Sequence, residues 1–426
     1  MTFLKIRIRQ GVWAVVTSLL LLACGEDRTH EYEEKTALDH WMLEAMQATY
    51  LWGDSIKTEK IAWKDYFAAP STFFSKLIGN APIKDQWSWC EIDTLEEDHH
   101  QRGHFNHLDS YGLDFMLMQD PTGATNRQYA RVLTVYPNSP AERCGLERGD
   151  FIGMVDGNRM TSSQTSALEN GRGRTIVRSR FGVNEETQEF YWLQTDTLTM
   201  ERSTRVADAA FPLCKKVVSD GSSVAYLQCN SLNASLDELM DLARQIDAMQ
   251  TKTLVLDLRL CNEGTLESAR LLASFLIDES YSDETFAKTI FRESRSSDNR
   301  TYGFEPQAVA NNLSVTRLYV ITSSYTSGPA EWLIRSLQAL DETGFVTTVG
   351  TKSAGQVVLT ESVEGKGYFV TIHPAVAFVA DRLGNYEYED GIAPDIEVNE
   401  FEYAYLYPYG DARETVLLTI LSIIPE

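Results

Sequence analysis

Residues 318–358, LYVITSSYTSGPAEWLIRSLQALDETGFVTTVGTKSAGQVV, contain the pattern that decides the fold. An apolar, β-branched run at 318–322 predicts a buried parallel strand, and apolar residues at helical spacing predict a helix over 329–340. A second short strand is predicted at 345–349, before a loop bounded by glycines. A strand, a sharp turn and a helix N-terminus form the geometry in which many hydrolases present a nucleophile, although the same joint also serves purely structural roles.

The rest of the C-terminal half, residues 201–426, repeats this alternation of strands and helices. Strands are predicted at 223–228, 253–258, 368–373 and 375–379, and helices at 236–249, 265–277 and 412–424. A βαβ order with few hairpins is typical of a mostly parallel sheet covered by helices. The sequence therefore predicts the α/β class for this region.

Residues 108–200 show a different pattern, with short strands separated by turn residues. The segment SPAERCGLERGD predicts a short helix closed by Gly145 and a turn, followed by an apolar strand at 151–155. This order resembles a PDZ domain. The resemblance implies that four residues form a carboxylate-binding loop and the edge strand to which a peptide adds. These residues are Tyr111, Gly112, Leu113 and Phe115. The alternative is a PDZ fold whose binding groove is occluded.

The N-terminus carries three basic residues, an apolar run from Val12 to Leu22, and the ending Leu-Leu-Ala-Cys. This ending resembles the bacterial lipobox. The resemblance implies a signal peptide at 1–23, a lipidated Cys24 and a polar tether over 24–36. We therefore expect a protein that is lipid-anchored to the bacterial outer membrane, periplasmic or surface-exposed; an uncleaved anchor helix is the alternative and also leaves the chain outside the cytoplasm.

Residues 37–107 are predicted to form a small helical domain and a linker, with helices at 37–51 and near 63–77. The many aromatic residues at helical spacing favour a packed core over a stacking platform for a ligand. A His-rich run follows, HHQRGHFNH at 99–107, whose histidines have spacings compatible with zinc on a helix. Gly103 weakens that helix, so a solvated linker is expected and no metal is predicted.

Charge and cysteine content exclude some functions. A formal net charge of −23 disfavours nucleic acid as a partner, because the phosphate backbone is also negative. Beyond Cys24 there are five cysteines, an odd and sparse set that does not describe a disulfide framework. One bridge, between Cys229 and Cys261, is conceivable, since each follows a predicted strand of the same sheet.

The central stretch resembles the core of the C-terminal processing (tail-specific) serine peptidases, whose motifs read roughly T-A-S-A-S-E and G-x-x-T-x-G-K. Thr326 and Glu331 match the first motif, and two glycines match the second. The resemblance implies a crotonase-like α/β peptidase core, a preceding PDZ domain and a small N-terminal helical domain. It assigns the nucleophile position to Gly328 and the general-base position to Gln356.

The chemistry of such an enzyme requires a serine hydroxyl, a buried lysine that accepts its proton, and backbone donors for the oxyanion. Glycine and glutamine supply neither the hydroxyl nor the base. The family's oxyanion motif D-L-R-x-N-G-G-G appears here as DLRLCNEG, which keeps Gly264 but has Cys261, Asn262 and Glu263 in place of Asn, Gly and Gly. We therefore predict a degenerate peptidase, without a cofactor, that binds peptides or protein C-termini.

Two other functions are compatible with the sequence. The chain is an active serine endopeptidase if Ser327 acts as nucleophile with Lys352, or another residue, as base. Alternatively it is a scaffold whose aromatic N-terminal domain docks a partner lipoprotein. A thiol hydrolase based on Cys261 is not expected, because no histidine lies in a supporting motif.

Overall fold

The structure is a computed structural model, and it describes part of the chain. The described residues are 29–79, 81, 85–92, 109–184, 186–187, 190–207, 209–219, 221–340, 344–403 and 405–424. They divide into two units. The first comprises residues up to 98 together with 360–376, and the second comprises 99–359 and 377–426. Residues 360–376, which the sequence assigned to the C-terminal core, thus group with the N-terminal residues.

The second unit contains a six-stranded sheet with the order β10-β11-β13-β17-β18-β23. Its strands are β10 (Leu213–Ser219), β11 (Ser222–Gln228), β13 (Thr253–Asp257), β17 (Arg317–Thr322), β18 (Val346–Gly350) and β23 (Ile396–Glu397). Only the β10–β11 pair is antiparallel in this sheet as described. The predicted α/β class and parallel sheet are confirmed.

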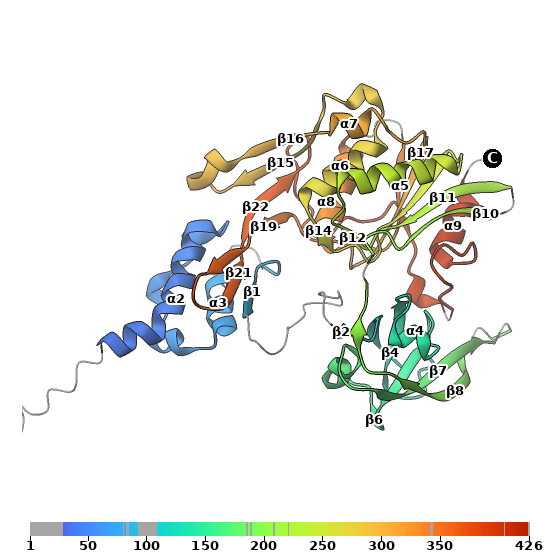
Figure 1. Ribbon diagram of the computed structural model, residues 1–426, viewed down its shortest axis with the longest axis horizontal. Coiled ribbons are helices and arrows are strands. Elements are labelled where there is room, and N and C mark those ends of the chain that lie inside the picture. Colours follow the sequence, from blue (N-terminus) through green and yellow to red (C-terminus); the bar gives the residue numbers. More distant parts are fainter. Residues whose placement is uncertain are drawn as a thin grey trace, which may run out of the picture. The chain divides into compact units, whose positions relative to one another are not determined.

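Helices cover both faces of this sheet (Figure 1). The connecting helices are α5 (Leu236–Ala248), α6 (Leu266–Leu276) and α8 (Pro329–Leu340), and the closing helix is α9 (Thr415–Ile423). Val416, Leu417 and Ile420 of α9 pack with alternate strand residues such as Tyr226 and Val255. Because side chains alternate across a strand, the intervening buried residues face the connecting helices. The core is therefore a helix–sheet–helix sandwich.

A second sheet with the order β16-β15-β22-β19 was not anticipated as such. Its strands are β15 (Thr285–Phe291), β16 (Arg300–Gly303), β22 (Ala375–Ala380) and β19 (Val358–Thr360). The prediction of few hairpins missed the antiparallel β15–β16 pair, because β16 is largely exposed and carries polar residues. Shorter elements join these parts: β12 (Ser231–Leu232), β14 (Glu263–Gly264), η5 (Glu279–Tyr281), η6 (Glu293–Asp298), α7 (Pro306–Val309) and η7 (Glu400–Glu402).

The PDZ-like region forms its own antiparallel sheet with the order β3-β4-β5-β7-β8. Its elements are β2 (Asp109–Ser110), β3 (Leu113–Gln119), β4 (Gln128–Val135), α4 (Pro140–Arg143), β5 (Phe151–Val155), β6 (Asn158–Arg159), η4 (Ser162–Leu168), β7 (Arg174–Val183), β8 (Phe190–Met200) and β9 (Thr204–Arg205). The predicted strand at 151–155 and the short helix before Gly145 are confirmed. The edge strand, predicted at 111–115, is β3, which lies at the edge of the sheet but begins only at Leu113.

The first unit combines helices with a small sheet. Its elements are α2 (Thr29–Thr49), η1 (Gly53–Ser55), η2 (Thr58–Lys60), η3 (Trp63–Phe67), α3 (Pro70–Ile78), β1 (Trp89–Ile92), β20 (Val363–Gly365) and β21 (Val370–His373). Tyr50, Phe73 and Phe74 are buried, as expected for a packed core, whereas Trp63 and Phe67 of the same aromatic-rich region are exposed.

Two predictions for the first unit were wrong. The helix expected near 63–77 is split, because Pro70 lacks an N–H and disfavours helical geometry in the residue before it. Residues 29–36, expected to belong to a polar tether, are helical, since α2 begins at Thr29 in a stretch rich in Glu.

Some predictions fall outside the described residues, namely Cys24 with the signal peptide and the His-rich run at 99–107. Within the described ranges, no helix combines the length and apolar character needed to cross a bilayer. Those ranges likewise hold no group of three or more His, Cys, Asp or Glu side chains suited to a metal ion.

Candidate functional site

The turn between β17 and α8 is fixed to the segment that follows β13. Ser323 Oγ donates to the carbonyl of Arg259 (2.6 Å), and Thr326 Oγ1 donates to that of Leu258 (2.8 Å). The amide of Ser327 donates to the carbonyl of Cys261 (3.1 Å). These hydroxyls are buried, so each hydrogen bond avoids a desolvation cost. The turn is therefore held rigidly against the segment that would form an oxyanion hole.

Gly328 and Gln356 face each other across the site. Gly328 has φ +54°, a left-handed conformation that glycine adopts without strain and that a strained nucleophile turn also uses. A Cβ built at Gly328 would lie 2.9 Å from Oε1 of Gln356. Gln356 is positioned by its carbonyl, which accepts a hydrogen bond from Trp332 Nε1 (3.1 Å). The structure thus brings the two predicted positions of the nucleophile and the base together.

Glu331, in the first turn of α8, joins the two motifs. Its side chain is fully buried and accepts hydrogen bonds from the amides of Gly328 (3.1 Å), Gly355 (2.6 Å) and Gln356 (2.7 Å). The hydroxyl of Ser353 donates to it as well (2.5 Å). Burial raises the pKa of Glu331 to about 7, although the four donors stabilise the ionised form. Its role in this geometry is to bind the loop 351–357 to the helix N-terminus.

The raised pKa of Glu331 predicts a pH dependence of stability. Between about pH 5 and 7 the folded chain retains a proton that the unfolded chain has released, so stability falls as the pH rises through this interval. We expect the difference in unfolding free energy between wild type and Glu331→Gln to fall by about 2 kcal/mol from pH 5 to pH 8. Denaturant unfolding at both pH values measures it. The exposed Glu402→Gln is the control, and an equally flat difference for Glu331→Gln would contradict the assignment.

The segment 257–264 departs from an oxyanion hole in its chemistry. The Oδ1 atom of Asn262 is buried and has no hydrogen-bond partner among the described residues. Asn262 and Glu263 stand where the family's oxyanion motif has glycines, which allow a closer backbone approach than residues with side chains. Glu263 is exposed and pairs with Ser231 in the short β12–β14 ladder. Gly264, with φ +142°, is required there because a Cβ would lie 2.4 Å from the carbonyl of Leu232.

Ser327 and Lys352, proposed as an alternative nucleophile and base, differ in burial. Ser327 is 5% exposed, and its Oγ donates to the carbonyl of Asn262 in a long hydrogen bond of 3.5 Å. Lys352 has an exposed side chain, which lacks the burial that a Ser–Lys mechanism requires of its base.

A buried ionic cluster beneath the site was missed at the level of sequence. Arg259 is 2% exposed and contacts Asp257 (2.6 Å), Glu400 (2.7 Å) and Glu414 (2.8 Å). Glu400 also pairs with Arg148 (2.5 Å). Burial alone would raise the pKa of Glu400, but the two arginines lower it to about 2. The only signal for this cluster was the retained Asp-Leu-Arg motif, since both glutamates lie more than a hundred residues away in the chain.

In the predicted carboxylate-binding loop of the PDZ-like region, two amides are already engaged. The amide of Gly112 donates to Ser110 Oγ (2.9 Å), and that of Tyr111 donates to the carbonyl of Glu169 (3.2 Å). The side chain of Tyr111 is fully buried, and Leu113 is also buried. Phe115 packs against the core of the region. A peptide carboxylate would have to displace at least the Ser110 contact.

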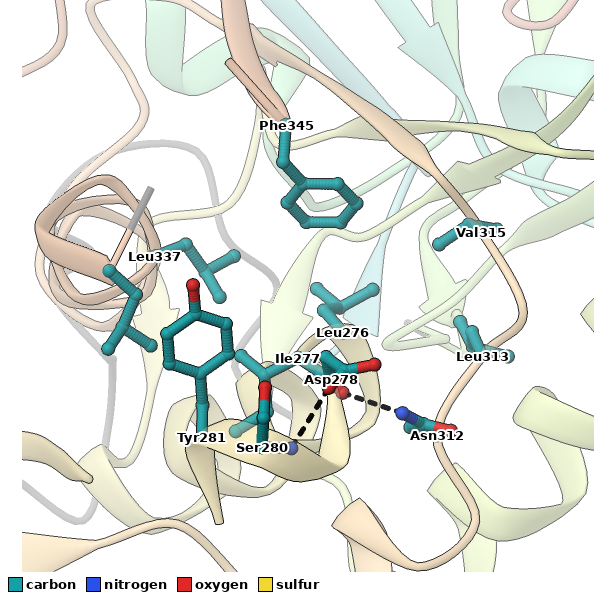
Figure 2. Close-up of a pocket in the computed structure, with 11 residues that line it drawn as sticks. Leu276, Ile277, Asp278, Ser280, Tyr281, Asn312, Leu313, Val315, Leu337 and Phe345 are labelled. Atoms are coloured by element: carbon teal, nitrogen blue, oxygen red, sulfur yellow. Dashed lines mark hydrogen bonds between the residues drawn. The ribbon is translucent and has the colours of Figure 1, made fainter. Parts of the chain in front are cut away.

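A cavity of about 310 Å³ lies elsewhere in the second unit. Figure 2 shows its apolar wall, with Leu276, Leu337 and Phe345, and a polar edge at Asp278 and Asn312. None of the predicted site residues lines it. The cavity is therefore separate from the site around Gly328.

The fold, with its α/β core and PDZ-like region, agrees with the protein families that match this chain. Residues 223–398 match the profile of peptidase family S41, residues 37–89 that of the peptidase S41 N-terminal domain, and residues 131–169 that of the PDZ domain. The chain belongs to peptidase family S41, with the N-terminal and PDZ domains found alongside its core.

Individual relatives agree with this membership. A carboxyl-terminal-processing protease of Picosynechococcus sp. is 28% identical over 247 residues, which are 57% of this chain and 55% of that protein. The match thus spans about half the length of that curated relative. A crystal structure from Bacteroides fragilis, described as an S41 protease, has a TM-score of 0.76 at 26% identity and covers 90% of this chain and 96% of its own. The photosystem II D1 C-terminal processing protease shares the fold, with a TM-score of 0.54 at 16% identity over 90% of this chain and 96% of its own.

Proposed function

We propose that this chain is a degenerate member of its family that binds peptides or protein C-termini without hydrolysing them. One observation carries the proposal: the two positions that face each other at the site are Gly328 and Gln356. Neither side chain can attack a carbonyl or take a proton near neutral pH. The replacement of two glycines of the oxyanion motif by Asn262 and Glu263 supports the same conclusion, because glycine permits close backbone approach.

The peptide would bind at the edge strand β3 and at the loop before it. An edge strand offers unpaired backbone groups to which an extended peptide adds as a further strand. The terminal carboxylate would replace Ser110 Oγ as the acceptor for the Gly112 amide. Breaking that internal contact weakens binding, because its free energy must be recovered from the peptide.

The expected result for peptide binding follows from this competition. Ser110→Ala removes the internal acceptor, so the affinity for a peptide with a free C-terminus should rise by about 2- to 10-fold. The affinity for the same peptide with an amidated C-terminus should not change. Titration by calorimetry or fluorescence anisotropy measures both, and the exposed Ser163→Ala serves as the matched control. Equal binding of free and amidated peptides by both proteins would exclude carboxylate capture.

The same samples test for hydrolysis. After prolonged incubation with the peptides and with an unfolded protein, mass spectrometry should find no cleavage products. Cleavage that disappears in Ser327→Ala would show that the chain is an active endopeptidase and would overturn the proposal. Cleavage that persists in this variant points to a contaminating enzyme.

We also propose that the chain is anchored to the bacterial outer membrane through a lipid on Cys24. The support is the lipobox-like sequence that ends the apolar N-terminal run. Cys24→Ala should abolish incorporation of labelled fatty acid and move the protein out of the membrane fraction, because a lipid chain supplies the anchoring apolar surface. Unchanged labelling of the variant would contradict the anchor.

A further inference from the structure

Two buried cysteines lie side by side beneath the site. The Sγ atoms of Cys229 and Cys261 are 3.8 Å apart, and both side chains are fully buried. Cys229 directly follows β11, and Cys261 lies in the turn after β13, the neighbouring parallel strand. The other cysteines beyond Cys24, which are Cys90, Cys144 and Cys214, are partly exposed.

Backbone hydrogen bonds fix both cysteines in this arrangement. The amide of Cys229 donates to the carbonyl of Asp257 (2.9 Å), and the amide of Cys261 donates to that of Leu258 (3.1 Å). A disulfide has a sulfur–sulfur distance of about 2.05 Å, so the two sulfurs need to approach by about 1.8 Å in total.

We propose that Cys229 and Cys261 form a disulfide when the chain folds in an oxidising compartment. The two thiols lose two protons and two electrons as the sulfur–sulfur bond forms. The oxidant is a second disulfide, that of a thiol–disulfide oxidoreductase or of oxidised glutathione, which is reduced to two thiols. This inference does not depend on whether the site hydrolyses peptides.

The timing of the oxidation follows from burial. A thiol reacts as the thiolate, and burial raises the pKa of the Cys229 thiol well above its usual range. Neither sulfur is accessible once the core has closed. The exchange therefore takes place during folding, and the finished disulfide is protected from reductants that act on the native protein.

The disulfide would restrict the movement of backbone segments that form the site. The carbonyl of Cys261 accepts the amide hydrogen of Ser327, which precedes Gly328 in the turn before α8. The bond would fasten the segment 257–264 to the end of β11 and, through Ser327, hold the turn. In the resembled peptidases this segment carries glycines, whereas here a covalent link would restrict its movement.

Peptide mapping of the full chain tests the proposal. The reduced, unfolded chain is diluted into a buffer of oxidised and reduced glutathione, and free thiols are then alkylated in denaturant before digestion. Mass spectrometry should find the peptides of Cys229 and Cys261 linked in wild type and in the control Cys214→Ala. In Cys229→Ala, Cys261 should be alkylated in full.

A second measurement uses stability. Closing a loop between residues 32 apart should raise the melting temperature of oxidised over reduced protein by about 5–10 °C. Cys229→Ala should show no such difference. Chain isolated from an oxidising compartment and mapped without refolding gives an independent reading. Full alkylation of Cys261 in wild type in both preparations, without reductant, would overturn the proposal.

Discussion

Gly328→Ser combined with Gln356→Lys is expected to convert the chain into a peptidase, with cleavage of an unfolded protein at least about 100-fold above that of either single variant. The reason is geometric, since a Cβ at position 328 points at the side chain of residue 356 from 2.9 Å. Replacing the glutamine also removes the group that this Cβ would meet. A serine at position 328 would be strained by about 1–2 kcal/mol, because the backbone there is left-handed. The hydrogen bonds that fix the turn can offset this strain.

The single variants are the matched controls for this gain, because each supplies only half of the pair. The rate should remain below that of an intact family member, since Asn262 and Glu263 still replace two glycines of the oxyanion segment. Cleavage is followed by gel and mass spectrometry, and a serine-directed reagent should label only the double variant, at position 328. A folded double variant that cleaves no better than the single variants would show that these positions are not the catalytic pair.

Arg259→Met is expected to destabilise the second unit by about 3–5 kcal/mol. The guanidinium group contacts three carboxylates that are themselves buried, those of Asp257, Glu400 and Glu414. Removing it leaves these charges without their shared counter-ion, and water cannot replace it in a buried site. Arg148 would still neutralise Glu400 in part.

The control for this loss is Arg413→Met, because Arg413 is 69% exposed and pairs with Asp411 at the surface. Its expected cost is much smaller, because solvent screens an exposed ion pair. Denaturant unfolding followed by circular dichroism at pH 7 compares the two variants. Equal small losses would mean that the buried cluster contributes specificity of packing rather than stability.

The sequence was sufficient for the elements whose apolar pattern is strong. The helix at 329–340 was predicted with the bounds observed, and the strand before it within one residue, because burial on both sides imposes continuous apolar runs. The hairpin β15–β16 was missed, since its exposed strand has no such pattern. The helix near 63–77 was wrong because Pro70 outweighed the helical spacing.

The sequence predicted those positions of the candidate site that lie in short motifs. The positions Gly328 and Gln356 could be placed by motif, but their mutual approach depends on a strand, a helix and a loop that only the fold brings together. The cluster around Arg259 was not predictable, because its partners Glu400 and Glu414 are distant in sequence and have no recognisable spacing. The role of Ser110 was also missed, because a hydrogen bond between its Oγ and a backbone amide produces no pattern in the sequence.

The glutamate at the start of α8 has a consequence for how genomes are interpreted. Glu331 receives four hydrogen bonds and ties one loop to one helix, a structural task that persists whether or not any bond is broken nearby. Selection for stability alone would therefore preserve this glutamate of the motif long after catalysis had ceased. A survey that counts enzymes by the presence of this acidic residue would include such chains, whereas one that reads positions 328 and 356 would separate them.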